Sequence, residues 1–276
     1  MRTSDTATTF SPTAQEGGFF ASLGRGALDL VSEVGFAGIL LWRSIVAMRA
    51  VPRSLRLILQ QMRRIGVESL PLVVMTSVFT GAVAAVQAAY QLMEFVPQIY
   101  IATAIYKSVV IELGPVLTSL VVGGRVSASI AAELGTMRVT EQIDAMDAMA
   151  IDPVRYLAMP RLVAALIMLP TLTVFADVLA IAGGFFVGYA SLEITPKTFV
   201  DGMRLLFYAH DVFGGLIKSF VFGGVIALMG TVAGFRTVGG AVGVGLSATK
   251  AVAASCVLVL IGNYVLAILL FQIIFD

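Results

Sequence analysis

Residues 162–190 read LVAALIMLPTLTVFADVLAIAGGFFVGYA and contain a single charged side chain, Asp177. A helix crosses the hydrocarbon core of a bilayer with about 20 mostly apolar residues, so this stretch is long enough to span a membrane. It forms the main part of a span that we place near 156–190. Four further apolar stretches lie near 68–93, 99–130, 211–235 and 250–275. The sequence therefore predicts an all-α integral membrane protein with five transmembrane helices.

The composition supports this fold class. Hydrophobic residues make up 58% of the 276 residues and charged residues 13%, and the mean hydropathy is +0.95. Soluble domains contain about 25% charged residues. The net charge of +1 provides no basic field, so we expect no nucleic-acid partner. Cys256 and His210 are the only residues of their types, which argues against a disulfide framework and against a metal site.

Two regions precede the first span. Residues 1–22 are rich in Ser, Thr and Gly without the apolar segment of a secretory signal, so we predict a disordered tail. Residues 23–64 are predicted to form an amphipathic interfacial helix, or elbow, since the apolar run Val34–Met48 is too short to span. Pro52 is expected to divide this region into two helices, and a solvated basic linker is the alternative. A basic stripe at helical spacing consists of Arg49, Arg53, Arg56, Gln60 and Arg63.

Lysine and arginine are distributed unequally between the two sides of the five-span region, residues 65–276. Segments on the side of the N-terminus hold most of them, and such segments face the cytoplasm in membrane proteins. We therefore expect a cytoplasmic N-terminus and place the C-terminus on the outside. The predicted outer side contains only Lys107, Lys197, Arg204 and Lys218. Within the fourth span, Gly230 and Gly234 are four residues apart and predict close helix packing.

The segment between the second and third spans is the most informative polar stretch. We predict a short cytoplasmic helix at about 135–150, with Thr140 as its cap and Pro153 ending it. An apolar ridge recurs every three residues, and acidic side chains flank it. A helix of this kind suits docking into a groove of a partner, although an ordinary connecting loop is an open alternative. The ridge is Ile143, Met146 and Met149, and the acidic residues are Glu141, Asp144 and Asp147.

This stretch and its surroundings resemble the MlaE family of ABC transporter permeases. The similarity extends from about residue 25 to the C-terminus and is strongest over 112–161. The matching elements are Glu112-Leu113-Gly114-Pro115, Gly124-Arg125, Ala132-Glu133-Leu134-Gly135-Thr136-Met137, Thr140-Glu141-Gln142, Met149-Ala150-Ile151-Asp152-Pro153-Val154-Arg155 and Pro160-Arg161. The resemblance implies that the predicted helix at 135–150 is a coupling helix contacting an ATPase. The coupling residues expected from it are Glu133, Arg138, Glu141, Asp144 and Met146.

The family also implies partners and a location. They are a second copy of the chain in a homodimer, a cytoplasmic ABC ATPase (MlaF-like), a periplasmic MCE-domain protein (MlaD-like) and, in some systems, a STAS-domain protein (MlaB-like). The implied cargo is phospholipid moved between the inner and outer membranes, which maintains outer-membrane lipid asymmetry. The chain would then be a non-catalytic, multi-pass subunit of the bacterial inner membrane without a cofactor of its own. ATP and magnesium would be bound by the partner ATPase.

Glu112 is the strongest candidate for a functional side chain within a span. An ionisable residue in an apolar helix is costly, so contact with a lipid headgroup or a polar cavity is one interpretation and a hydrogen bond between helices is the other. The adjoining Gly114-Pro115 predicts a kink. The resemblance further suggests that the outer end of the first span lines a lipid cavity, although an aromatic belt is the simpler reading. The lipid-binding candidates there are Gln87, Gln91, Leu92 and Phe95.

Two alternatives concern how transport is driven. Residues 239–250 are glycine-rich but lack the Lys-Ser/Thr pair of a phosphate loop, and we interpret them as a flexible turn. An ATPase must then be another chain. A secondary transporter or channel is the alternative function, but the intramembrane charges Glu112, Asp177 and Lys218 are sparse for ion coupling. The chain departs from the family pattern at Asn263, where an Asp is common, and at Ile111, where some members have Arg.

Overall fold

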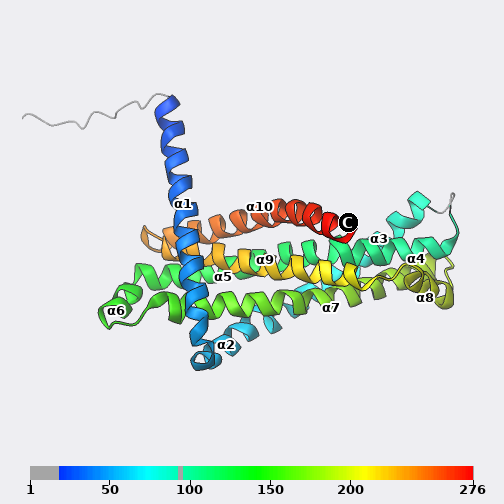
Figure 1. The fold of residues 1–276 in the computed structure, drawn as a ribbon, viewed down its shortest axis with the longest axis horizontal. Helices are drawn as coiled ribbons and strands as arrows, with labels where there is room; N and C mark the ends of the chain where they lie inside the picture. Colours follow the sequence, from blue (N-terminus) through cyan, green and yellow to red (C-terminus); the bar gives the residue numbers. More distant parts are fainter. Residues whose placement is uncertain (1–18, 93–95, 276) are drawn as a thin grey trace, which may run out of the picture.

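The computed structural model describes residues 19–92 and 96–275, and every regular element in these ranges is a helix (Figure 1). Five helical segments among the described residues are long and apolar enough to cross a membrane, namely Leu55–Leu92, Gln98–Val139, Val154–Ser191, Ala209–Phe235 and Gly240–Leu270. The predicted all-α, five-span fold is therefore confirmed. The α-helices are α1 (Phe19–Ala47), α2 (Leu55–Ile65), α3 (Leu70–Leu92), α4 (Gln98–Ser108), α5 (Gly114–Val139), α6 (Gln142–Ala148), α7 (Met159–Ser191), α8 (Pro196–Leu205), α9 (Ala209–Phe235) and α10 (Gly240–Phe275).

Helix α1 lies across the bundle, near the end where α6 is found, and is not among the five spans (Figure 1). Its residues Leu40 and Ser44 are buried, while Trp42 between them is 69% exposed. A one-sided contact of this kind is expected of an interfacial helix. Most of the predicted tail, residues 1–18, lies outside the described residues, and α1 begins at Phe19.

The elbow region is divided as Pro52 predicts. Helix α1 ends at Ala47, the 3-10 helix η1 (Met48–Arg53) contains Pro52, and α2 begins at Leu55. The break has a consequence for the basic stripe. Only Arg56, Gln60 and Arg63 share one helix, because a stripe at helical spacing requires an unbroken helix.

Four long helices and the α4–α5 segment form the bundle. Helix α3 packs on α7, α7 on α9, and α9 on both α5 and α10. Helix α10 also packs on α5 and has a narrow buried stripe, Ala251, Ser255 and Val259, with a spacing of four residues. Helices α6 and α8 lie at opposite ends of the bundle, which we call the α6 end and the α8 end (Figure 1).

Glycines allow the closest helix contacts. A Cβ atom at Gly81 of α3 would lie 1.7 Å from the carbonyl oxygen of Ala180 of α7, and one at Gly183 would lie 2.3 Å from the carbonyl oxygen of Val78. In α9, a Cβ at Gly234 would lie 2.5 Å from Leu134 of α5, and one at Gly230 would lie 2.9 Å from the carbonyl oxygen of Ser127. The predicted packing role of Gly230 and Gly234 is confirmed, since any side chain would force these backbones apart.

Two local predictions are wrong. Thr140 does not cap α6: it follows the last turn of α5, and the N-cap of α6 is Glu141 in a left-handed conformation with φ 59°. Residues 240–250 are not a flexible turn but the first turns of α10, which begins ten residues before the predicted fifth span. The glycines there do not prevent a helix because a helix tolerates single glycines at roughly 1 kcal/mol each.

Candidate functional site

Glu112 lies in a distorted turn between α4 and α5. Residues Val109–Leu113 form a π-helical turn, η3, in which the Gly114 N–H bonds to the carbonyl of Val109, five residues earlier. Such single wide turns often occur at functional sites. Helix α4, η3 and α5 thus form one continuous rod from the α8 end to the α6 end, with an irregular turn at Glu112 where a straight α-helix would otherwise run.

Two side chains from other helices converge on Glu112. Lys218 of α9 forms an ion pair with the Glu112 Oε1 atom and also donates to the carbonyl of Ile111 at 3.2 Å. Asn263 of α10 donates from Nδ2 to Glu112 Oε2 at 3.0 Å. The Lys218 side chain is 3% exposed, whereas Glu112 is 42% exposed. The carboxylate is therefore bonded to side chains of two other helices, as the second interpretation predicts, and it remains accessible, while contact with a lipid headgroup stays a prediction.

A cavity of about 380 Å³ opens beside this cluster, between the α4–η3 segment, α9 and α10. Glu112, Lys218, Lys107 and Asp211 provide its charges, and much of the remaining wall is apolar. Lys107 pairs with Asp211 at 3.2 Å. A cavity with an apolar wall and a few fixed charges is suited to a ligand that is itself both apolar and charged.

The other lipid-binding candidates are not part of this cavity. Gln87 and Gln91 are exposed on α3, and Leu92 is partly buried against a core cluster that includes Ile101 and Phe199. Phe95 lies outside the described residues. Within one copy of the chain, the structure therefore does not bring the end of α3 together with Glu112.

The coupling candidates fall into two groups. Arg138 at the end of α5 pairs with Asp144 of α6, and Met146 packs against the main core together with buried Ile143. Glu141 is exposed. Met149, the third residue of the predicted ridge, is 64% exposed, so the ridge divides into two inward residues and one outward residue. Helix α6 thus lies anchored at the end of the bundle with its acidic residues exposed.

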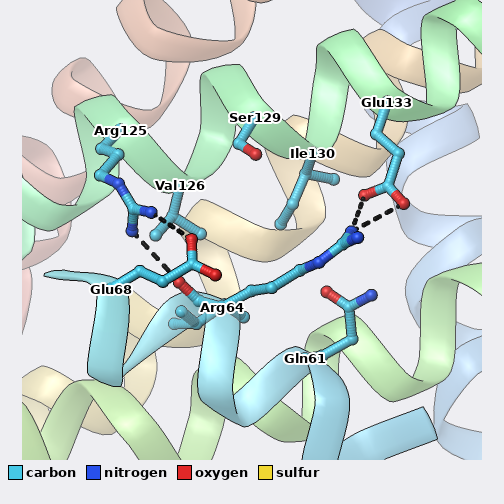
Figure 2. Close-up of a pocket in the computed structure, with 9 residues that line it drawn as sticks. Gln61, Arg64, Glu68, Arg125, Val126, Ser129, Ile130 and Glu133 are labelled. Carbon is cyan, nitrogen blue, oxygen red and sulfur yellow. Dashed lines mark hydrogen bonds and ion pairs between the residues drawn. The ribbon is translucent and has the colours of Figure 1, made fainter.

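Glu133 lies in a different charge cluster (Figure 2). Arg64 of α2 donates to both carboxylate oxygens of Glu133 at 2.9 Å, and Arg161 of α7 lies 3.0 Å from Oε2. Arg125 of α5 pairs with Glu68 at 2.7 Å and donates to the carbonyl of Arg64 at 3.1 Å. Glu133 therefore joins α2, α5 and α7, and its ion pairs among the described residues do not involve α6. Its position indicates a role in holding the elbow against the bundle.

Comparisons with known proteins identify the family. A family model described as Permease MlaE matches residues 58–269, more than half of the chain. The chain belongs to the MlaE permease family. A probable ABC transporter permease protein of Rickettsia bellii is 39% identical to this MlaE-family chain over 252 residues, which cover 91% of this chain and 97% of that protein.

Two further relatives extend the comparison. A probable ABC transporter permease protein of Synechocystis is 40% identical over 214 residues, covering 78% of this chain and 81% of that protein. The intermembrane phospholipid transport system permease protein MlaE of Haemophilus influenzae is 27% identical over 254 residues, covering 92% and 97%. This MlaE-family chain is accordingly a multi-pass ABC transporter permease, and an ABC permease works with an ATPase.

Sequence reasoning missed the partners of both charge clusters. It counted Lys218 both among the outer-side residues and among the intramembrane charges, but did not pair it with Glu112, against which the side chain is buried. The position of Lys218 inside an apolar span marked it as a candidate but could not name its partner. Nothing in the spacing of Arg64 and Arg161 along the chain relates them to Glu133.

Proposed function

We propose that this chain is the permease subunit of an ABC transporter that moves phospholipid between the inner and outer membranes. The observation that carries the proposal is the cavity at the α8 end, where the Glu112–Lys218–Asn263 cluster adjoins an apolar wall. A phospholipid has the same division into charged headgroup and apolar chains. The name of the Haemophilus influenzae relative supports the choice of phospholipid as cargo.

Lys218 is the residue suited to a headgroup phosphate. An ammonium has three donors, and two of them are directed to Glu112 and to the carbonyl of Ile111. In the proposed complex the third donates to a ligand in the cavity that Lys218 lines. Glu112, being accessible, suits the amine of a zwitterionic headgroup, and the nearby apolar residues Ala267 and Leu270 suit acyl chains.

We further propose that a separate ATPase docks on α6 and supplies the energy for transport. The support is geometric: α6 is anchored by Ile143 and Met146, while Glu141, Asp144 and Asp147 remain exposed. A push on α6 reaches α5 through the Arg138–Asp144 pair and the short connection at Thr140. Since α5 leads directly to the π-helical turn at Glu112, movement of this rod changes the walls of the cavity.

The remaining assembly follows the family resemblance. It consists of two copies of this chain, the ATPase with its ATP and magnesium, an MCE-domain protein on the periplasmic side and a STAS-domain protein, in the bacterial inner membrane. The chain itself is a non-catalytic subunit without a cofactor. The outward face of α10 supports a contact with a second copy, because it exposes a continuous apolar surface that includes Val257, Ile261 and Tyr264.

The test is lipid transport by the reconstituted complex in proteoliposomes, with mass spectrometry of the lipids that the purified complex retains. Lys218→Met and Glu112→Gln are expected to reduce ATP-dependent phospholipid transfer and lipid retention. Lys197→Gln is the matched control, because Lys197 is exposed on α8 and does not line the cavity. Transfer driven by an ion gradient without ATP would contradict the proposal and favour a secondary transporter.

A further inference from the structure

Two hollows flank the Arg64–Glu133 ion pair on the side of the molecule where α2 meets α5 and α7. One has a volume of about 470 Å³ and the other about 530 Å³, and both include Gln61, Arg64, Glu68 and Glu133 in their walls. Figure 2 shows the first of them, with Arg64 extending from α2 toward Glu133 and with Arg125 beside Glu68. We call the two hollows together the elbow groove.

Positive charge exceeds negative charge in the elbow groove. Its walls contain the four arginines Arg63, Arg64, Arg125 and Arg161 but only two acidic residues, Glu68 and Glu133. The ion pairs described above therefore leave two positive charges without a carboxylate of their own among the lining residues. A surplus of positive charge favours an anionic ligand. The guanidinium group of arginine also matches the geometry of phosphate or carboxylate oxygens.

One donor of a groove residue lacks an acceptor among the described residues. Arg161 is 3% exposed, and its Nε–H is buried without a hydrogen-bond partner. The amide of Gln61 and the hydroxyl of Ser129 also line the first hollow. Buried donors are rarely left unpaired, so the groove borders a guanidinium whose hydrogen bonds are incomplete among the described residues.

The groove is located where the apolar surface of the bundle begins. Directly after Glu68, α3 exposes the large apolar side chains Leu72 and Met75, and α2 exposes Leu55 and Leu59. Exposed apolar residues of a membrane protein face lipid chains, and the basic residues beside them lie at headgroup level. The groove therefore lies within reach of a lipid headgroup as well as of the aqueous phase.

We propose that the elbow groove binds a phosphate group, supplied by the headgroup of an anionic phospholipid at this membrane surface or by free phosphate. Arg125 and Ser129 contribute a charge and a neutral donor in the first hollow, Arg63 contributes a charge in the second, and Gln61 lines both. Binding holds α2 against α5 and α7, because the ligand contacts the elbow and the bundle together. This site is separate from the cavity at Glu112, and it does not depend on which cargo the transporter moves.

The experiment measures binding of three probes to the delipidated full-length chain in detergent by native mass spectrometry. The probes are phosphatidylglycerol, dioleoylglycerol, which has the acyl chains without phosphate, and inorganic phosphate. We expect phosphatidylglycerol to bind and dioleoylglycerol not to bind at comparable concentration. If inorganic phosphate binds with the same dependence on Arg63 and phosphatidylglycerol does not, the phosphate site is supported and its source is the free anion.

Charge variants localise the binding. Arg63→Gln is expected to weaken phosphatidylglycerol binding roughly tenfold, because a hydrogen bond to a charged group contributes about 1.5 kcal/mol or more. Glu68→Gln is expected to strengthen binding, a gain that loss of folding cannot produce. Arg56→Gln is the matched control, since Arg56 is exposed on the same helix but outside both hollows.

Three results would overturn the proposal. One is an equal loss of binding in Arg56→Gln and Arg63→Gln, which would indicate unspecific attraction to a basic surface. Another is equal binding of dioleoylglycerol and phosphatidylglycerol, which would show that the site does not recognise the phosphate group. The third is unchanged or weaker binding in Glu68→Gln, since removing a negative charge from a phosphate site must favour the anion.

Discussion

The Nζ atom of Lys218 lies 3.2 Å from the carbonyl oxygen of Ile111, the carbonyl four residues before Pro115. Proline has no N–H, so a helix that contains Pro115 cannot supply the usual donor to that carbonyl. In a membrane span, an unsatisfied carbonyl costs several kcal/mol, and a neighbouring helix can provide the donor. Lys218 provides it from α9, and the same ammonium pairs with Glu112. One side chain thus satisfies both the backbone defect and the intramembrane carboxylate.

The first prediction concerns this shared partner. Lys218→Met leaves both Glu112 and the Ile111 carbonyl without the ammonium, and we expect a loss of about 1–3 kcal/mol in stability. The double variant Lys218→Met/Glu112→Gln should be more stable than Lys218→Met alone, because it removes the unpaired charge. Thermal unfolding in detergent measures both. Additive destabilisation in the double variant would show that the two residues do not interact.

The second prediction contrasts two charge pairs. Glu133→Gln leaves the guanidinium of Arg161, 3% exposed, without its counter-ion, so we expect a loss of about 2–3 kcal/mol. Arg43→Gln breaks the pair with Asp152, whose members are 54% and 45% exposed, and should cost less than about 1 kcal/mol. Melting temperatures of the two variants in the same detergent provide the comparison. Equal shifts would indicate that Glu133 does not hold α2 and α7 to α5.

The third prediction concerns helix contact. Gly81→Ala introduces a Cβ that would overlap the backbone oxygen of Ala180, so α3 and α7 must separate, and we expect a cost of about 1–3 kcal/mol or failure to fold. Gly245→Ala is the control, because a Cβ there meets nothing within 4 Å and alanine favours the helix by up to about 1 kcal/mol. Folded yield after detergent extraction and thermal unfolding distinguish the two.

The fourth prediction tests docking at α6. Met149→Asp changes a side chain that is 64% exposed, so the melting temperature of the chain should stay the same while co-purification of the ATPase falls. The control is Lys197→Glu, an exposed change at the α8 end. Retention of the ATPase by Met149→Asp, together with its retention after deletion of residues 137–149, would exclude α6 as the docking site.

The fifth prediction concerns orientation. In a Cys256→Ala background, which removes the chain's one cysteine, single cysteines at Ala148 and at Lys197 report the two ends of the bundle. The unequal distribution of lysine and arginine predicts that a membrane-impermeant maleimide applied to spheroplasts labels Lys197→Cys and not Ala148→Cys. The reverse pattern would place α6 on the periplasmic side, where no cytoplasmic ATPase reaches it.

The sequence by itself determined the parts of this protein that depend on local composition. The apolar stretch 162–190 is long enough to span wherever its neighbours lie, and Pro52 ends a helix because it lacks an N–H, whatever packs around it. The family signature from Glu112 to Arg161 likewise consists of short sequence motifs, which can be recognised without the structure. The tight contacts at Gly230 and Gly234 could be predicted because only small residues allow helix backbones to approach so closely.

Tertiary structure alone decided which charges meet. Glu112 and Lys218 are 106 positions apart, and Arg64 and Glu133 are 69 apart. Their pairing depends on how α2, α5 and α9 rotate and pack, which hydropathy and helical spacing do not specify. The left-handed backbone conformation of Glu141 and the π-helical turn at Glu112 could not be predicted from hydropathy or helical spacing either. A strained backbone conformation is held by contacts from other helices, and those contacts exist only once the bundle has formed.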